Sequence, residues 1–98
     1  MSIQSDPGFA WDPAKAAANF RVHGVAFPEA ASALEDEQSL TREDSDASGE
    51  TRFVTLGMSA LGRLLVVVWT PREPDAIRLI SAWKANARQR ALYGQDIG

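Results

Sequence analysis

Positive side chains without nearby carboxylates gather toward the end of this sequence. The cations between residues 78 and 93 are Arg78, Lys84, Arg88 and Arg90. The same segment has no aspartate or glutamate, although the whole chain has a net charge of −3. It starts in an apolar run and continues into a stretch that favours helix, and such a junction is a favourable place for phosphate. The charge asymmetry therefore predicts an anionic ligand or partner.

The chain has a single histidine, His23. Histidine is the side-chain type that titrates near neutrality, so His23 is a natural general acid or base. The alternative is a structural residue that caps the first helix and hydrogen-bonds in the core. Lys15 and Asn19 precede it at intervals of four residues, so a helix would place all three on one polar stripe. For Lys15 and Asn19, a solvated or structural face is favoured over direct chemistry.

Arginines at apolar strands form a second group of candidates. Arg63 begins one apolar run and Arg78 lies within another, where an unpaired guanidinium is costly. Each must therefore meet a carboxylate, a carbonyl or an external anion. Glu50 precedes Arg52 by two residues, so an extended strand would point both side chains to the same side. The two form either a base beside a phosphate clamp or a plain ion pair, and the ion pair is favoured.

The rest of the composition restricts the class of protein. With 98 residues the chain can bury one core, so a single domain over residues 9–98 is expected, after a frayed leader at residues 1–8. The absence of cysteine excludes disulfides and thiolate metal sites, and no metal or cofactor is expected. The leader lacks the features of a signal peptide, and the apolar run 64–69 is too short to span a bilayer, which predicts a soluble cytoplasmic protein.

Three helices are expected to position these residues. Asp12 and Pro13 are typical of a helix start and Gly24 of a helix end, which predicts a helix over 13–23. A second helix is predicted from Pro28 to Leu34. The last one is predicted from Lys84 to Leu92, before Gly94.

Three apolar runs, at 52–58, 63–70 and 76–82, are separated by short links and predict an antiparallel meander. In the middle run, Leu64, Val66 and Val68 alternate with Leu65, Val67 and Trp69, so both faces of the sheet should be at least partly covered. A weak strand is expected near 39–41, inside an acidic segment with seven carboxylates between residues 35 and 50. The predicted fold class is α+β, with two N-terminal helices, an antiparallel sheet of three to four strands and a C-terminal helix.

Several short motifs then suggest a family. The first group is Phe9-Ala10-Trp11-Asp12-Pro13-Ala14-Lys15, Asn19, Val22-His23-Gly24-Val25 and Phe27. The second group is Glu50-Thr51-Arg52-Phe53, Leu56-Gly57, the run 62–68 and Thr70. The third group is the run 77–82, Lys84-Ala85, Arg90 and Tyr93. In this order and spacing they resemble the BrnT family, toxins of bacterial type II toxin–antitoxin systems, over nearly the whole chain.

The resemblance implies a RelE-like ribonuclease fold, endonucleolytic cleavage of RNA without metal, and neutralisation by a BrnA-type antitoxin. Trp83 stands where the family commonly has arginine, Gln89 where it often has glutamate, and Asn86 where threonine is usual. The first departure removes a guanidinium beside the phosphate, which would lower activity. A catalytically weak RNA-binding or regulatory module on the same scaffold is therefore the alternative function.

Metal-free RNA cleavage needs a base, an acid and cations for the charge that develops on phosphorus. The expected catalytic set is His23, Glu50, Arg52, Arg63 and Arg78. Because the family fold places its active site on the sheet, phosphate is the favoured partner of Arg63 and Arg78. The expected RNA-binding set is Lys15, Trp83, Lys84, Arg88 and Arg90. For Trp83 the two interpretations are a stacking platform for an unpaired base and a core residue.

The partner is expected to be a folded ribbon-helix-helix antitoxin that dimerises through its own DNA-binding part. Two toxin chains would then be carried in a 2:2 heterotetramer. The acidic segment and the basic last helix are opposite patches that suit a partner wrapped around the domain. The negative net charge argues against strong duplex binding by the chain alone, so operator DNA would be contacted only through the antitoxin.

Overall fold

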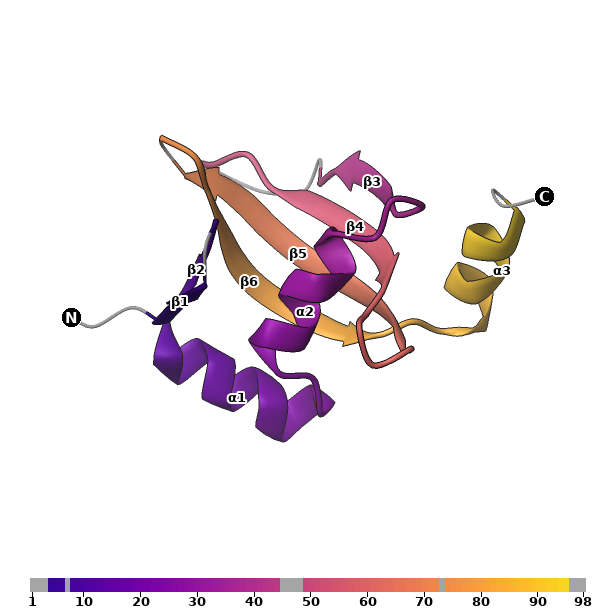
Figure 1. The fold of residues 1–98 in the computed structure, drawn as a ribbon, viewed down its shortest axis with the longest axis horizontal. Coiled ribbons are helices and arrows are strands. Elements are labelled where there is room, and N and C mark those ends of the chain that lie inside the picture. Colours follow the sequence, from indigo (N-terminus) through magenta and orange to yellow (C-terminus); the bar gives the residue numbers. More distant parts are fainter. Residues whose placement is uncertain (1–3, 7, 45–48, 73, 96–98) are drawn as a thin grey trace.

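A computed structural model describes residues 4–6, 8–44, 49–72 and 74–95 of the chain. Figure 1 shows two helices packed against one side of a twisted sheet and a third helix beyond the sheet's far end. The elements follow one another in the order β1 (Gln4–Asp6), β2 (Phe9–Trp11), α1 (Pro13–His23), α2 (Phe27–Leu34), β3 (Leu40–Glu43), β4 (Phe53–Met58), β5 (Leu64–Arg72), β6 (Ala76–Lys84) and α3 (Ala87–Gln95). The predicted α+β class is confirmed.

The sheet has six strands in the order β1-β2-β6-β5-β4-β3. Strands β4, β5 and β6 form the predicted antiparallel meander. The expected size of three to four antiparallel strands is wrong, because β1 and β2 extend the sheet beyond β6 and β2 runs parallel to it. The frayed leader expected over residues 1–8 includes residues 4–6, which instead form strand β1. Each of the two extra strands has three residues, too short for a periodic signal, and β2 provides backbone partners for one end of β6.

The first helix has the ends that its sequence predicts. The Asp12 carboxylate accepts a hydrogen bond from the Ala14 N–H at 2.9 Å, and Pro13 occupies the first turn. At the other end Gly24 has a φ of 71°, and its N–H donates to the Phe20 carbonyl. A side chain at position 24 would be strained by that φ, so glycine ends the helix there.

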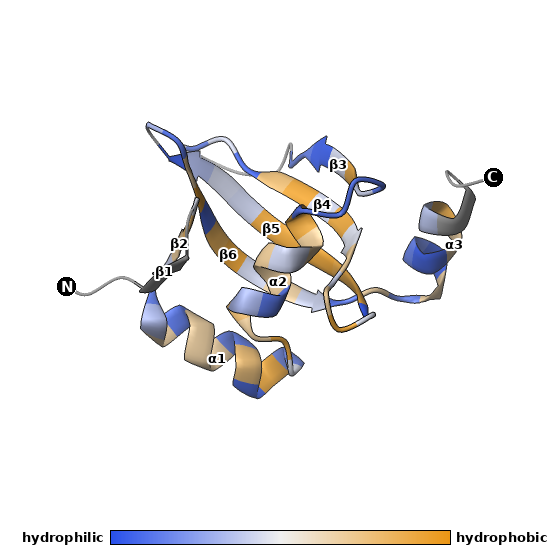
Figure 2. Cartoon of the chain, viewed as in Figure 1, coloured by the Kyte–Doolittle hydropathy of each residue, from blue (hydrophilic) through white to orange (hydrophobic). Residues whose placement is uncertain are grey.

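The larger core lies between the sheet and helices α1 and α2. Val25, Phe27, Leu65, Val67 and Leu79 are almost completely buried in it. The strands that carry most of these residues are the most apolar parts of the fold (Figure 2). Helix α2 approaches β4 so closely that a Cβ atom at Gly57 would lie 2.3 Å from the Ala33 carbonyl oxygen. Glycine is therefore required at this contact.

The opposite side of the sheet, here called the open face, has a smaller core. Leu56, Leu64 and Val66 are buried there, and Trp83 and Tyr93 pack against them. The alternation predicted for the middle strand is confirmed, since Leu65 and Val67 belong to the core under the helices. None of the described helices is long and apolar enough to cross a membrane.

The last helix begins later than expected. The residue pair Leu65 and Lys84 continues the β5–β6 ladder, and the Ala85 N–H donates to the Leu64 carbonyl, so this stretch is strand rather than helix. Asn86 and Gln89 then cap the start of α3 by reciprocal hydrogen bonds of 2.8 and 2.9 Å. Gly94 does not end the helix, which continues to Gln95.

Candidate active site

Helix α1 and strand β6 form two adjoining shallow hollows. Lys15, Asn19 and His23 line the first hollow together with Ser81, so the predicted stripe faces one site. The second hollow is lined by Val22, His23, Trp83 and Lys84. The rings of His23 and Trp83 are 6.0 Å apart and tilted by 45°. Four predicted site residues therefore meet here, and Lys15, His23, Trp83 and Lys84 are called the His23 shelf below.

Asn19 joins the two elements of the shelf from below. Its side-chain amide donates to the carbonyls of Val25 and Ala82 at 3.0 and 2.9 Å. Its oxygen accepts from the Ala82 N–H and the Ser81 hydroxyl, both at 3.0 Å. These bonds satisfy backbone groups of β6 beyond the short segment that pairs with β2. The structural interpretation of Asn19 is thereby confirmed.

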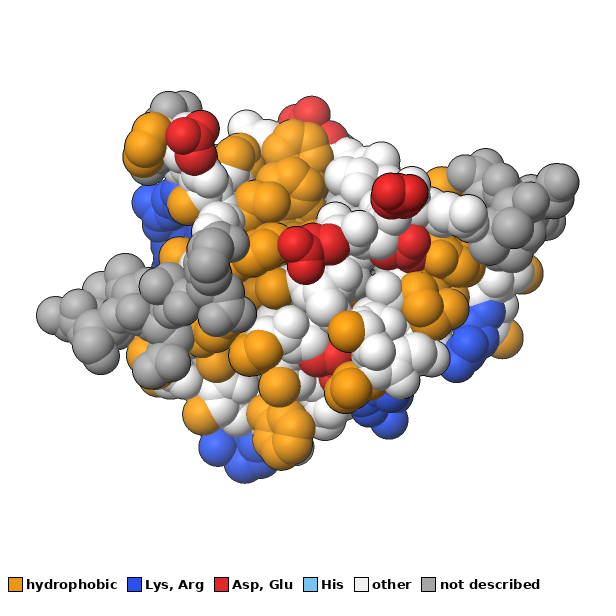
Figure 3. All heavy atoms as spheres, viewed as in Figure 1, with side chains coloured by type: hydrophobic (Ala, Val, Ile, Leu, Met, Phe, Trp, Pro, Cys, Tyr) orange, Lys and Arg blue, Asp and Glu red, His pale blue; other side chains and the backbone are white. Residues whose placement is uncertain are grey.

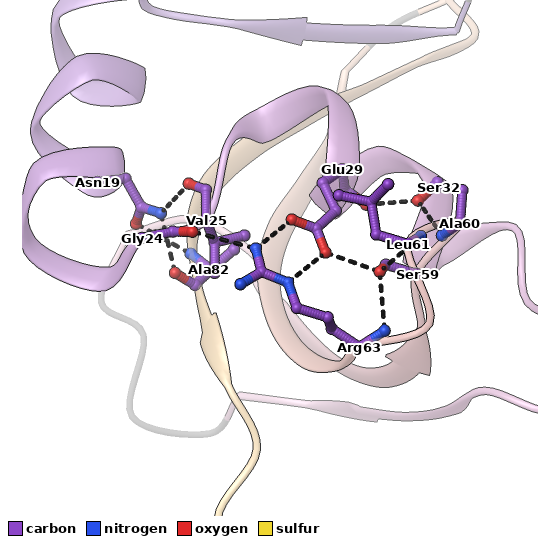
Figure 4. A network of polar contacts seen from close by, with 10 residues as sticks. All are labelled: Asn19, Gly24, Val25, Glu29, Ser32, Ser59, Ala60, Leu61, Arg63 and Ala82. Atoms are coloured by element: carbon purple, nitrogen blue, oxygen red, sulfur yellow. Dashed lines mark hydrogen bonds and ion pairs between the residues drawn. The ribbon is translucent and has the colours of Figure 1, made fainter.

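Arg63 meets a carboxylate and a carbonyl inside the fold (Figure 4). Its Nε donates to Glu29 Oε2 at 2.8 Å, and its Nη2 bonds to both Glu29 Oε1 and the Gly24 carbonyl, the latter at 3.1 Å. The Glu29 side chain is only 6% exposed. The hydrogen bond from Arg63 lowers the pKa of Glu29 despite the opposing effect of burial, and the same bond raises the pKa of Arg63. Phosphate binding by Arg63 stays a prediction that these contacts disfavour.

Glu50, Arg52 and Arg78 lie toward the other end of the sheet. Arg78 pairs with Thr70 of β5, and the β4–β5 register places Arg52 on the other side of Thr70. Because side chains alternate along a strand, Arg52 and Arg78 both project from the open face. The Arg52 Nε is 3.7 Å from Glu50 Oε1, which is an ion pair but too long for a hydrogen bond. Within the described part of the chain, this buried Nε has no hydrogen-bond acceptor.

The cations of α3 are separate from both groups. Arg88 lines an apolar groove of about 300 Å³ on the open face, opposite Arg42 of β3. Arg90 is exposed on the same helix. Trp83 combines its two predicted environments, since it packs on the open-face core and also lines the His23 shelf.

Two polar anchors were missed in the sequence. Glu29 lies in the alanine-rich helix predicted from Pro28 to Leu34, and its signal was a lone carboxylate between Phe27 and Leu34. Tyr93 donates to Asp36, which also accepts from the Met58 N–H. Burial raises the pKa of Asp36, but hydrogen bonds from Tyr93, Met58 and Gln38 outweigh it, so the pKa lies below its ordinary value. These bonds fasten α3 to the sheet.

Comparison with known proteins now assigns the family. No curated protein matches the chain. The structure is similar to the 1.1 Å crystal structure of the Brucella abortus ribonuclease toxin BrnT, with a TM-score of 0.57 and 20% sequence identity over 78% of this chain and 92% of that one. At this identity the likeness supports the fold. A family model for the ribonuclease toxin BrnT of type II toxin–antitoxin systems matches residues 11–89. The chain therefore belongs to the BrnT family of ribonuclease toxins of type II toxin–antitoxin systems.

Proposed function

We propose that the chain cleaves single-stranded RNA endonucleolytically and without metal at the His23 shelf. The observation that supports this site is that His23 lines both of two adjoining hollows, one together with Lys15 and the other together with Trp83 and Lys84. The imidazole supplies acid–base chemistry, and Lys15 and Lys84 supply positive charge for a phosphate. Trp83 supplies an aromatic surface for an unpaired base.

In the proposed reaction His23 takes the proton of the ribose 2′-hydroxyl, and the 2′-oxygen forms a bond to phosphorus. The bond between phosphorus and the 5′-oxygen breaks, which leaves a 2′,3′-cyclic phosphate and a 5′-hydroxyl. The departing oxygen takes its proton from Lys84, the cation that shares the second hollow with His23. Water then restores the protonation of both residues.

Arg52 and Arg78 are proposed to bind a second phosphate farther along the same RNA strand. Arg78 and Trp83 both lie on β6, about 16 Å apart along an extended strand. Two strands that flank a third are roughly 10 Å apart, a gap that two arginine side chains can close around one phosphate. A phosphate oxygen would also satisfy the buried Nε of Arg52. Glu50 beside Arg52 is the alternative general base, and it would move the cleavage centre to this end of the sheet.

The test uses a single-stranded RNA and a duplex of the same sequence, both incubated with the purified protein in EDTA. We expect cleavage of the single strand, slow cleavage of the duplex, and products that end in 2′,3′-cyclic phosphate. Loss of all cleavage in EDTA, with recovery on addition of Mg²⁺, would contradict the metal-free mechanism. Products with 3′-hydroxyl ends would contradict attack by the 2′-oxygen.

The alternative is a catalytically weak module that binds RNA without cutting it. Two observations favour it: Trp83 replaces the family's common arginine, and the Arg63 guanidinium is held by Glu29. Gel retardation without cleavage supports this alternative. Replacement Trp83→Arg separates the causes, since higher activity would show that the missing guanidinium limits cleavage, whereas weaker RNA binding would support stacking by Trp83.

Membership of a type II system implies an antitoxin partner. We propose that it is a BrnA-like ribbon-helix-helix protein that forms a 2:2 heterotetramer in the cytoplasm and alone contacts operator DNA. Exposed charges of both signs support a partner that wraps the domain. Glu35, Glu37 and Glu43 are exposed near α2 and β3, and Arg88 and Arg90 are exposed on α3. On the helix-covered side, most of the visible carboxylates lie in the upper half, whereas lysines and arginines lie at the upper left and along the lower and right margins (Figure 3).

Light scattering of the co-expressed pair and a mobility-shift assay on the upstream DNA test the assembly. A mass that corresponds to two copies of each chain is expected, with DNA binding that requires the antitoxin. A one-to-one heterodimer would contradict the stoichiometry. Promoter binding by this chain alone would contradict the assignment of DNA contacts to its partner.

A further inference from the structure

The backbone directly after His23 is held at two successive carbonyl groups. His23 is the last residue of α1, and the Gly24 carbonyl that follows accepts from Arg63 Nη2 at 3.1 Å. The next carbonyl, that of Val25, accepts from the Asn19 amide at 3.0 Å. Figure 4 shows that these two donors come from different parts of the fold, Asn19 from α1 and Arg63 from the turn just before β5. The end of α1 is therefore fixed from both sides.

Arg63 can hold this carbonyl because its own position is fixed. Glu29 binds its guanidinium through both carboxylate oxygens, and Glu29 Oε2 also accepts from the Ser59 hydroxyl at 2.7 Å. The Ser59 oxygen in turn accepts from the N–H groups of Leu61 and Arg63. The lowered pKa of Glu29 keeps its carboxylate charged at neutral pH. A closed network thus joins α2, the β4–β5 turn and the end of α1.

The imidazole itself depends on this support. Among the described residues the His23 ring makes no hydrogen bond, and its ring contact is with Trp83 at 6.0 Å. A side chain without a hydrogen bond of its own takes its position from its backbone and its packing. Asn19 also holds Ala82, the residue before Trp83, through both its N–H and its carbonyl. Asn19 holds the backbone beside Trp83, and the Glu29–Arg63 network holds the backbone beside His23, so the two together set the relative placement of both rings.

We propose that Glu29 and Arg63 are positioning residues that hold His23 opposite Trp83 and do not bind the RNA phosphate. The proposal rests on the proposed role of His23 in cleavage. It predicts that the pair acts on the rate of the chemical step, because a misplaced base leaves substrate binding intact. A phosphate-binding Arg63 would behave differently, since Glu29 would then only compete with the RNA for its guanidinium.

The experiment compares Arg63→Lys, Arg63→Gln and Glu29→Gln with the wild type, and Leu61→Ala is the matched control. Leu61 lies in the same turn and is 72% exposed. Steady-state cleavage gives kcat and KM separately, and NMR of the His23 ring reports its distance from Trp83. We expect kcat to fall on the order of tenfold to a hundredfold in Arg63→Gln and Glu29→Gln, with KM within about twofold. Arg63→Lys should lose less, and the control should match the wild type.

The ring signal of His23 should move in both neutral variants and stay unchanged in the control. If Arg63 instead binds phosphate, Glu29→Gln should keep or raise activity while Arg63→Gln raises KM, and that pattern would overturn the proposal. Unchanged His23 signals in both variants would also overturn it. Where a variant fails to fold, Ser59→Ala weakens the same network more gently and takes its place.

The NMR readout does not require that His23 be the catalytic base. Full activity of His23→Ala would refute the proposed function alone. The positioning of the ring by Glu29 and Arg63 would still be tested by the movement of its signals.

Discussion

Arg52 and Arg63 stand immediately before neighbouring strands of one sheet, yet their surroundings differ. The Arg63 guanidinium donates hydrogen bonds within the fold to a carboxylate that is nearly buried and to a backbone carbonyl. The Arg52 side chain forms an ion pair with Glu50 at 3.7 Å, and both side chains are well exposed. Among the described residues its buried Nε has no hydrogen-bond acceptor. The difference separates a cation that stabilises the protein from one that can still take an external anion.

The largest expected effect is the difference in thermal stability between Arg63→Ala and Arg52→Ala. Arg63→Ala leaves Glu29 charged and nearly buried without its partner, so we expect the Tm to fall on the order of 10 °C. Arg52→Ala removes a well-exposed ion pair and should change the Tm by about 2 °C or less. Thermal unfolding followed by circular dichroism measures both. Equal losses would erase the distinction drawn between the two residues.

For RNA binding the order should be reversed, with a larger effect of replacing Arg52 than of replacing Arg63. Arg52→Ala and Arg78→Ala should each lower kcat/KM by about tenfold, mainly through KM, because each removes a phosphate contact. Each should also make binding less dependent on salt, by about one unit of the logarithmic slope. Fluorescence anisotropy with a labelled single-stranded RNA at several salt concentrations measures these changes. Wild-type KM and salt dependence in both variants would exclude a phosphate site at this end of the sheet.

The contribution of Glu29 to the stability of the folded protein should depend on pH. Its folded-state pKa is lowered below the ordinary value of 4.5, so its stabilising effect is complete above that value and is lost as pH falls through the folded pKa. The Tm difference between wild type and Glu29→Gln should therefore be constant near neutrality and shrink below about pH 4.5. Asp36 titrates in both proteins and so does not affect the difference. A gap that widens toward acid pH would contradict this assignment.

Tyr93→Phe should have the smallest effect. It removes the hydrogen bond to Asp36 that fastens α3, while the ring can remain in the open-face core. We expect faster amide hydrogen exchange in α3 and little change elsewhere. Cleavage should fall slightly, because the predicted RNA-binding residues Arg88 and Arg90 lie on the loosened helix. The loss should be smaller than in Arg78→Ala, which removes a phosphate contact directly. Unchanged exchange in α3 would show that Asp36 does not anchor it.

Local patterns predicted most of the fold. The Asp12 and Pro13 start of α1, its Gly24 end and the alternation in β5 are written in short stretches of sequence, and all are present. Strands β1 and β2 could not be predicted this way because three residues show no clear period. Helix α3 was placed too early because residues 84–86 favour helix locally, whereas pairing with β5 keeps Lys84 in the sheet.

The sequence predicted which residue types belong to the candidate site, but not which of these residues lie close together. His23, Trp83 and Lys84 could be named individually, and only the packing of α1 on β6 brings them together. The carboxylate partner of Arg63 is Glu29, which lies 34 residues away in the chain on helix α2. No spacing rule connects two such positions, so only the tertiary structure could distinguish Arg63 from Arg52.

The most direct measurement compares His23→Ala with Glu50→Gln in the EDTA cleavage assay, using variants shown by circular dichroism to be folded. General acid–base groups contribute roughly a hundredfold to ten-thousandfold to a rate. We expect His23→Ala to lower kcat by at least a hundredfold and Glu50→Gln to lower it by about tenfold or less. Wild-type kcat in His23→Ala together with a hundredfold loss in Glu50→Gln would contradict the His23 shelf as the cleavage centre.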